Sequence, residues 1–351
     1  MSVVESRFVR TGLLRKGFGA VLLVLASAAA VLAQGASVFY KGRTINLYIG
    51  YSPGGAYDLY ARVIARHMGA HIPGNPTIVP QNMEGAGSLR LANYLYRVAP
   101  QDGTAMATFG RGIAFDPLLL GQGDAFNAEK MNWLGSANNE VSVCVAMKSS
   151  GITSFQDLFT KELTVGGTGA SSDTDQFPRV LNAELGTHFK IVQGYPGGND
   201  VVLAMERGEV AGRCGWSWSS VLSTHKSWIA DKRMIVLVQL SLTKHPDLPD
   251  VPLAMDFAKT DEQRLILKML FARNVMGRPF VAPPNVPADR VAVLRQAFMD
   301  TMKDKDFLAE ADKMQLEINP VSGADVESLV KEVYATPPAV VAKAKQAAES
   351  Q

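Results

Sequence analysis

Two glycine-containing loops hold the residues whose types and spacing are best suited to binding an anion. The first covers residues 51–58, reads Tyr-Ser-Pro-Gly-Gly-Ala-Tyr-Asp and follows the apolar run 45–50. A helix that begins there would present amides without intrahelical acceptors, and Gly54 and Gly55 would let a carboxylate approach the backbone closely. The alternative is that the glycines only turn the chain and that Asp58 only caps the helix.

The second loop again joins an expected strand to an expected helix. Residues 164–175 read Thr-Val-Gly-Gly-Thr-Gly-Ala-Ser-Ser-Asp-Thr-Asp. The hydroxyl groups of this loop can donate to a ligand oxygen, or they can cap the helix and bond their own backbone. The loop lacks the Gly-Lys-Ser/Thr of a phosphate-binding loop and the Gly-x-Gly-x-x-Gly dinucleotide fingerprint, so we do not predict nucleotide binding.

Catalytic and metal-binding patterns are weak elsewhere in the chain. Residues 215–219 read Gly-Trp-Ser-Trp-Ser, which lacks the second glycine of a nucleophile elbow, and no histidine is tied by spacing to a serine or cysteine. His67 and His71 have the i, i+4 spacing of a helical metal site, but Gly69 and Pro73 predict a helix end there. We therefore predict no enzymatic activity, no metal site and no cofactor.

Residues 1–33 have the pattern of a secretory signal peptide. Four basic side chains precede an apolar stretch over 17–32, and small residues suited to cleavage follow at Ala33 and Ala36. The alternative is an uncleaved membrane anchor, but the stretch is shorter than the roughly 20 apolar residues that a spanning helix needs. We predict cleavage near residues 33–36 and export to the periplasm.

The net charge of the chain does not indicate a class of binding partner. The whole chain carries +2, but residues 1–33 hold four basic and one acidic side chain, which leaves about −1 for the remainder. No basic run, and no basic patch interleaved with aromatic residues, occurs in that remainder, so we expect no nucleic-acid partner. Some 315 residues follow the cleavage region, which is enough for two domains with separate cores.

Strand and helix patterns alternate along the chain, as is typical of α/β folds. Near the C-terminus, Ser322 and Asp325 form a capping signature ahead of an amphipathic helix, and a further helix follows Pro338. Expected strands lie at 45–50, 76–80, 104–109, 141–147, 163–166, 189–193, 211–216, 234–240 and 275–281.

The order and spacing of several short motifs resemble the periplasmic substrate-binding proteins of tripartite tricarboxylate transporters, also called the Bug family. The motifs span nearly all of the chain after the signal peptide. They are Tyr-Lys-Gly-Arg-Thr-Ile at 40–45, Ser-Pro-Gly-Gly at 52–55 with Asp58, Glu-Gly-Ala-Gly at 84–87, Ala-Pro-Gln-Asp-Gly at 99–103, Pro-Asp-Leu-Pro-Asp-Val-Pro at 246–252, Ala-Pro-Pro at 282–284 and Val-Pro-Ala at 286–288.

The resemblance implies a two-lobed α/β binding protein of type II-like architecture. Each lobe would be a mixed sheet flanked by helices, crossing strands would join the lobes, and the ligand would lie in the cleft between them. Residues 37–140 and 271–351 would form the first lobe, and 141–270 the second. The family is not enzymatic, and its members clamp a small organic acid.

Carried onto this chain, the resemblance implies a set of ligand-binding residues from both loops. Ser52, Gly55, Ala56 and Tyr57 would hold one carboxylate, with Asp58 ordering the loop. The second lobe would contribute Thr168, Gly169, Ala170 and Ser171. Further candidates stand where strand ends should face the cleft, and these are Arg111, Tyr195, Gly197 and Trp216.

Arg111 and two tryptophans bear on which acid is bound. A guanidinium can grip a carboxylate with two hydrogen bonds, but Arg111 can equally form an ion pair at the surface or between the lobes. Trp216 and Trp218 stand where family members commonly have small apolar and acidic residues. Either indole in the cleft would favour a long, flat or aromatic acid, whereas packing in the core or at the rim is the alternative.

The resemblance also implies a disulfide between the two cysteines. Cys144 and Cys214 fall on strands that the family fold places side by side, and export provides an oxidising compartment. Closing a loop of about 70 residues contributes about 4 kcal/mol on the chain-entropy model. Two buried free thiols are the alternative.

The resulting functional prediction is an extracytoplasmic binding protein for a small organic acid. A di- or tricarboxylate of four to ten carbons is favoured, and an aromatic carboxylate comes second. The resemblance implies that the protein, expected to be a monomer, docks on a membrane permease with a large and a small subunit. A sensory role at a receptor and a secreted enzyme that uses the same cleft are the alternatives.

Overall fold

The structure is a computed structural model that describes residues 38–120 and 126–349. The predicted signal peptide, residues 1–33, and its cleavage region lie outside the described residues. Within the described ranges, no helix combines the length and the apolar character needed to cross a membrane.

The first sheet has six strands in the order β11-β4-β10-β3-β1-β2. β1 runs parallel to β2 and β3, whereas β10 runs antiparallel to β3 and β4, so the sheet is mixed. β1 buries Ile45, Leu47 and Ile49 completely, which gives this sheet the apolar contacts that hold its helices. Its strands are β1 (Thr44–Ile49), β2 (Thr77–Asn82), β3 (Ala105–Thr108), β4 (Asn132–Ser136), β10 (Pro279–Ala282) and β11 (Val321–Ser322).

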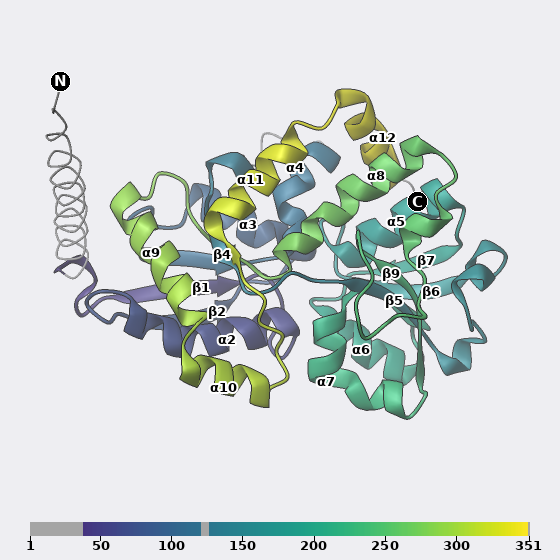
Figure 1. Ribbon diagram of the computed structural model, residues 1–351, viewed down its shortest axis with the longest axis horizontal. Coiled ribbons are helices and arrows are strands. Elements are labelled where there is room, and N and C mark those ends of the chain that lie inside the picture. Colours follow the sequence, from purple (N-terminus) through teal and green to yellow (C-terminus); the bar gives the residue numbers. More distant parts are fainter. Residues whose placement is uncertain (1–37, 121–125, 350–351) are drawn as a thin grey trace, which may run out of the picture.

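The second sheet has five strands in the order β7-β6-β8-β5-β9. β6 runs parallel to β7 and β8, and β5 runs antiparallel to β8 and β9. The strands are β5 (Ser142–Met147), β6 (Leu163–Gly167), β7 (Phe189–Gln193), β8 (Gly212–Ser217) and β9 (Met234–Leu240). The two sheets lie side by side along the long axis of the molecule (Figure 1).

Helices cover both sheets, as the alternation of patterns predicts. Around the first sheet lie α2 (Ala56–Met68), α3 (Leu89–Arg97), α4 (Asp116–Leu119), α9 (Ala288–Thr301), α10 (Lys305–Lys313) and α11 (Gly323–Tyr334). Around the second lie α5 (Asp173–Leu185), α6 (Gly198–Arg207), α7 (Trp218–Ala230), α8 (Asp261–Phe271) and α12 (Pro338–Glu349). Short 3₁₀ helices are η1 (Gly69–His71), η2 (Ala86–Ser88), η3 (Arg111–Phe115), η4 (Ala128–Lys130), η5 (Lys148–Ser150), η6 (Phe155–Phe159), η7 (Ala254–Phe257) and η8 (Ala272–Met276).

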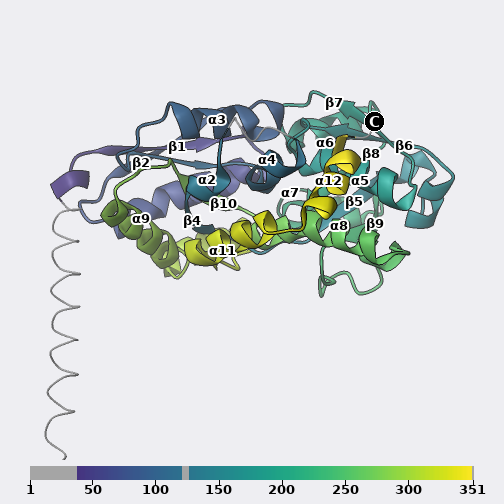
Figure 2. The same cartoon turned by 90° about the horizontal axis from the view of Figure 1, so that it is seen from above.

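Two chain segments cross between the sheets and are hydrogen-bonded to each other. The N–H of Glu140 donates to the Asn274 carbonyl at 2.9 Å, and the N–H of Gly277 donates to the Asn138 carbonyl at 3.0 Å. The C-terminal chain also crosses, because α11 packs on β4 whereas α12 packs on α5 and α8 as well as on α4 (Figure 2). The lobe boundaries themselves remain a prediction.

The α/β fold with two mixed sheets is confirmed, and most predicted strands lie within two residues of observed ones. The strand expected at 275–281 starts only at Pro279, because η8 occupies the residues before it and the Asn274 backbone is held by the crossing segment. β4 and β11 were not predicted. The predicted cap is present, since the Ser322 hydroxyl accepts from the Asp325 N–H at 3.2 Å and α11 begins at the next residue.

Candidate ligand-binding site

A cavity of about 90 Å³ lies between the two sheets and is lined from both sides. The first wall, as we call it, consists of the lining residues of the first loop together with Gly110, Arg111 and Arg278. The second wall consists of lining residues from the second loop, α6, β8 and α7. Both predicted anion loops contribute residues to this cavity.

The first wall is built around the start of α2. Gly55 is the N-cap, so the amides of Ala56 and Tyr57 stand in the first turn and have no intrahelical acceptor. The loop is ordered by Asp58, whose carboxylate accepts from the Gly54 N–H at 3.0 Å and from the side chain of Arg62 at 2.9 Å. Burial alone would raise the pKa of Asp58, but these hydrogen bonds and one from Asn82 outweigh it and lower the pKa.

Several hydrogen-bond donors of the second loop bond to acceptors in the loop itself or at the start of α5. The Thr168 N–H donates to the Thr174 hydroxyl at 2.9 Å, and the Gly169 N–H donates to the fully buried Asp175 carboxylate at 3.0 Å. The Ser172 hydroxyl bonds the Gly169 carbonyl at 2.7 Å and also reaches Asp175. The loop and the start of α5 line the cavity with Thr168, Ser172, Asp173 and Thr174.

Arg111 forms an ion pair that joins the two walls. Its Nε lies 2.6 Å from Oδ2 of Asp173, the first residue of α5, and its Nη2 donates to the Ser142 hydroxyl at 2.5 Å. Asp173 also pairs with Arg273 at 3.3 Å. Arg111 is 2% exposed, and its Nη1 has no hydrogen-bond partner, so one donor remains available beside the cavity. The interlobe ion pair is thus present, and a role in ligand binding stays a prediction.

Two further arginines line the cavity. Arg278 is 3.7 Å from Glu140, and its guanidinium donates to Ser217 at 3.1 Å and to Ser220 at 2.7 Å. Arg213, on β8, has no acidic partner within the described residues; it lies 4.7 Å from the ring of Trp216 and donates to the Gly198 carbonyl at 3.0 Å. Burial lowers the pKa of Arg213 to about 9, which leaves the guanidinium protonated at neutral pH.

The walls touch each other around the cavity. Ser52 donates to Asn199 at 3.0 Å and to Asp200 at 2.7 Å, both in the first turn of α6. On the other side, a Cβ added to Gly169 would lie 2.6 Å from the Gly87 nitrogen, so only glycine permits this backbone approach. The cavity is therefore enclosed by direct contacts between segments of both sheets.

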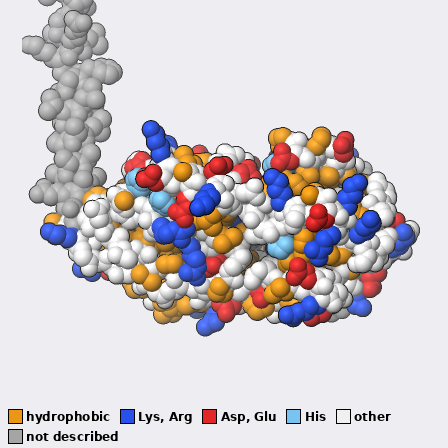
Figure 3. Space-filling view, turned by 90° about the horizontal axis from the view of Figure 1, so that it is seen from below, with side chains coloured by type: hydrophobic (Ala, Val, Ile, Leu, Met, Phe, Trp, Pro, Cys, Tyr) orange, Lys and Arg blue, Asp and Glu red, His pale blue; other side chains and the backbone are white. Residues whose placement is uncertain are grey.

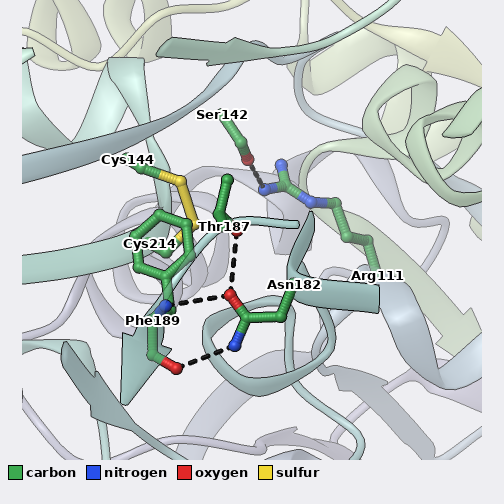
Figure 4. The surroundings of a disulfide bond; sticks show 7 residues. All are labelled: Arg111, Ser142, Cys144, Asn182, Thr187, Phe189 and Cys214. Atoms are coloured by element: carbon green, nitrogen blue, oxygen red, sulfur yellow. Dashed lines mark hydrogen bonds between the residues drawn. A yellow bond between two sulfur atoms is a disulfide. The ribbon is translucent and has the colours of Figure 1, made fainter. Parts of the chain in front are cut away.

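The predicted disulfide between Cys144 and Cys214 is confirmed. It joins β5 to β8 beneath the second wall, and Figure 4 shows it in the same region as the hydrogen bond from Arg111 to Ser142. Both cysteines are fully buried, and Cys214 directly follows Arg213 in the chain. The crosslink therefore restrains the strand that carries Arg213 and Trp216.

The structure gathers part of the predicted site around the cavity. Gly55, Ala56, Tyr57, Arg111, Thr168 and Trp216 line it. Trp218 does not; its indole N–H faces Asp247 at 3.5 Å. The remaining predicted residues lie outside the lining, and their contact with a ligand stays a prediction; they are Ser52, Asp58, Gly169, Ala170, Ser171, Tyr195 and Gly197.

Sequence reasoning missed several lining residues, chiefly Arg213, Arg278, Gly198 and His225. One signal was available for Arg213, since it is a lone charge within the apolar strand pattern 211–216. A strand buried on both faces has no place for such a charge unless it serves a site. Arg278 carried a weaker signal, a charge directly before the apolar run at 279–282.

Charged side chains outside the cavity are of both signs. In Figure 3, Lys and Arg are interspersed with Asp and Glu over both halves of the molecule. His67 and His71 each face an acid of the α10 region, Glu310 at 2.7 Å and Asp304 at 3.0 Å. Nowhere in the described ranges do three or more His, Cys, Asp or Glu side chains cluster to suit a metal ion.

Comparison with known proteins finds one relative in sequence and several solved structures of similar fold. No protein-family model matches it. It is 26% identical over 219 residues to the UPF0065 protein in the tcbD-tcbE intergenic region of Pseudomonas sp. strain P51, a match that covers 61% of this chain and only 62% of that relative.

Solved structures show the same fold over most of the chain. The periplasmic binding protein BugD matches with a TM-score of 0.71 and 17% identity, over 89% of this chain and 99% of BugD. MatC from Rhodopseudomonas palustris, solved with bound malate, matches with a TM-score of 0.68 and 18% identity, over 88% and 99% of the two chains. The predicted resemblance to Bug proteins and the two-sheet fold that it implies are thus confirmed.

Proposed function

We propose that this chain is a member of the Bug family that captures a small organic acid in the periplasm. The observation that supports this most directly is the charge of the cavity: three arginines line it, and Arg213 has no acidic partner in the described chain. An unpaired cation that is partly shielded from solvent is costly, and a bound anion reduces that cost. The free amides at the start of α2 provide a second place for negative charge.

The preferred ligand is a di- or tricarboxylate of four to ten carbons, and an aromatic carboxylate is second. The cavity of about 90 Å³ favours the short end of that range. Malate bound to MatC, a protein of the same fold, supports a carboxylate of this size. Trp216 in the second wall is the feature that keeps an aromatic acid second.

Capture would proceed by closure of the two walls on the ligand. Contacts such as Ser52 with Asp200 form only when the first loop and α6 approach each other. A ligand that bridges the walls shifts the population from open to closed. The closed form, as a monomer, then docks on the large and small subunits of a tripartite tricarboxylate transporter permease and delivers the acid.

A thermal-shift screen tests the proposal. Purified protein, freed of copurified ligand by unfolding and refolding, is screened against mono-, di- and tricarboxylates, aromatic acids, amino acids and sugars. A ligand at 100 times its dissociation constant stabilises by about 2.7 kcal/mol, which raises the melting temperature by about 4 °C in a chain of this size. A shift with organic acids is expected. A rise in melting temperature with sugars alone, or no rise with any acid, contradicts the proposal.

A further inference from the structure

The geometry points to Arg213 as the residue that selects ligands carrying a second acidic group; this inference rests on the proposed function. Of the three cavity arginines, two have an acidic partner within 4 Å. Arg111 is paired with Asp173 at 2.6 Å, and Arg278 lies 3.7 Å from Glu140. Arg213 alone among the three has no carboxylate within 4 Å in the part of the chain that the structure describes.

Two contacts hold the Arg213 side chain in place beside the cavity. Its guanidinium lies against the Trp216 ring at 4.7 Å, and one nitrogen donates to the Gly198 carbonyl at 3.0 Å. Its Nε is buried and has no hydrogen-bond partner. Stacking and one hydrogen bond fix the plane of the group, and they leave donors for a planar oxyanion.

Gly198 makes this position possible. A Cβ at residue 198 would lie 2.3 Å from Nη2 of Arg213 and 2.7 Å from the guanidinium carbon. Any other residue at the start of α6 would therefore displace the charged group. The glycine and the arginine, 15 residues apart in the chain, form one unit.

We expect one acidic group of the ligand at the start of α2 and a second acidic group at Arg213, because these two places are distinct. The amides of Ala56 and Tyr57 lie on the first wall, whereas Arg213 belongs to β8 of the other sheet, and all three line the same cavity. A ligand with one carboxylate at the α2 start would leave Arg213 enclosed and uncompensated. A ligand with two acidic groups neutralises it, so Arg213 favours the diacid over its singly charged analogue.

Matched ligands isolate this contribution. Isothermal titration calorimetry compares succinate with its monoamide succinamate, and adipate with its monoamide, because each pair differs by one charge at nearly constant shape. In the wild type the diacid should bind at least 30-fold more tightly than its monoamide. Arg213→Gln should weaken the diacid about 30-fold and change the monoamide less than threefold.

Two further variants keep the test independent of misfolding. Gly198→Ala displaces the guanidinium without removing it and should lower the ratio of diacid to monoamide affinity in the same direction. Arg233→Gln is the control, since Arg233 also stacks on a tryptophan, Trp228 at 4.8 Å, but does not line the cavity. It should leave both affinities unchanged.

The outcomes separate this inference from the proposed function. If the wild type binds monocarboxylates such as benzoate or the monoamides as tightly as the diacids, or if Arg213→Gln leaves the ratio unchanged, the role of Arg213 is overturned and an acid-binding protein stands. If the wild type binds no acid of any class, the proposed function fails first.

Discussion

The start of α2 and the start of α5 both follow a strand and a glycine loop, yet the hydrogen-bond donors of the two loops go to different places. In the first loop, Asp58 takes the Gly54 amide, and the amides of Ala56 and Tyr57 stay free. In the second, Asp175 and the hydroxyls around it take the loop's own donors. Both helices therefore supply an acceptor to the loop before them, α2 one carboxylate and α5 a carboxylate with its neighbouring hydroxyls, so the strand-glycine-helix pattern alone does not say which donors remain for an anion.

The two walls also differ in the hydrogen-bond donors that they present to the cavity. The first wall offers backbone amides beside two arginines that have acidic partners, whereas the second offers the side chain of Arg213, which has none in the described chain, and is restrained by the disulfide. Backbone donors cannot be removed by most substitutions, but a side-chain donor can. The second wall is thus the place where ligand preference can change while the fold persists.

The largest expected effect comes from the crosslink in the second wall. Replacing Cys144 and Cys214 together by alanine opens a connection between residues 70 apart in the chain and should lower the free energy of unfolding by about 4 kcal/mol on the chain-entropy model. Urea unfolding measures it, and reduction of the unaltered protein is the control for side-chain changes. Ligand affinity should fall as well, because β8 carries Arg213. Unchanged stability in both preparations would show that the crosslink restrains nothing.

A pH effect on stability should come from the buried contact between Asp116 and Gln176, which lies outside the cavity lining. Its carboxylate accepts from Gln176 of α5 at 3.0 Å, near Arg273 and Asp173, and burial raises its pKa to about 7. Because the folded pKa lies above the ordinary value of 3.8, the stabilisation is complete below about pH 4 and is lost as pH rises through 7. Between pH 4 and 7 the wild type should lose about 3 kcal/mol more than Asp116→Asn.

Urea unfolding at several pH values measures how the free energy of unfolding of each protein changes with pH. The raised pKa of Glu317, also caused first by burial, is present in both and cancels in the difference. Parallel curves for wild type and Asp116→Asn would contradict the assignment.

The two capping carboxylates should differ in their effect on stability. Asp175→Ala leaves the Gly169 amide and two hydroxyls without their acceptor in a buried site and should cost about 2.5 kcal/mol. Asp58→Ala frees donors that are partly exposed and should cost about 1.5 kcal/mol. Thermal unfolding of the two variants gives the comparison. An equal or reversed order would mean that the second loop does not depend on its own acceptors.

The smallest expected effect is on binding alone and tests the free amides of the first wall. Ala56→Pro removes one N–H at the first helical position, where proline is tolerated, and Gly55 before it is extended as proline requires. Loss of one hydrogen bond to a carboxylate should weaken acid binding by about 1.5 kcal/mol, roughly 10-fold. Calorimetry with the acid found in the screen measures it.

The matched control is Ala288→Pro, the first residue of α9, which lies away from the cavity. Both variants should keep the wild-type melting temperature. If Ala56→Pro binds the acid as tightly as Ala288→Pro, the carboxylate does not use that amide.

Much of the fold could be read from local patterns. The apolar run before the first loop, the glycines and the helix that follows were all visible in residues 45–62, and β1 and α2 formed there. β4 was missed because Trp133 and Leu134 form too short a run to stand out. The strand expected from 275 failed because Asn274 is held by a segment more than 130 residues earlier, which no local window contains.

By itself, the sequence determined which segments could bind an anion, since strand, glycine and helix-start signals depend only on neighbours in the chain. It also placed the two cysteines on strands that the family resemblance pairs. The tertiary structure decided which charges are neutralised: Arg111 meets Asp173, 62 residues away, whereas Arg213 meets a tryptophan and a carbonyl. Electrostatic pairing depends on distance in space and on burial, and both are set only when the two sheets pack together.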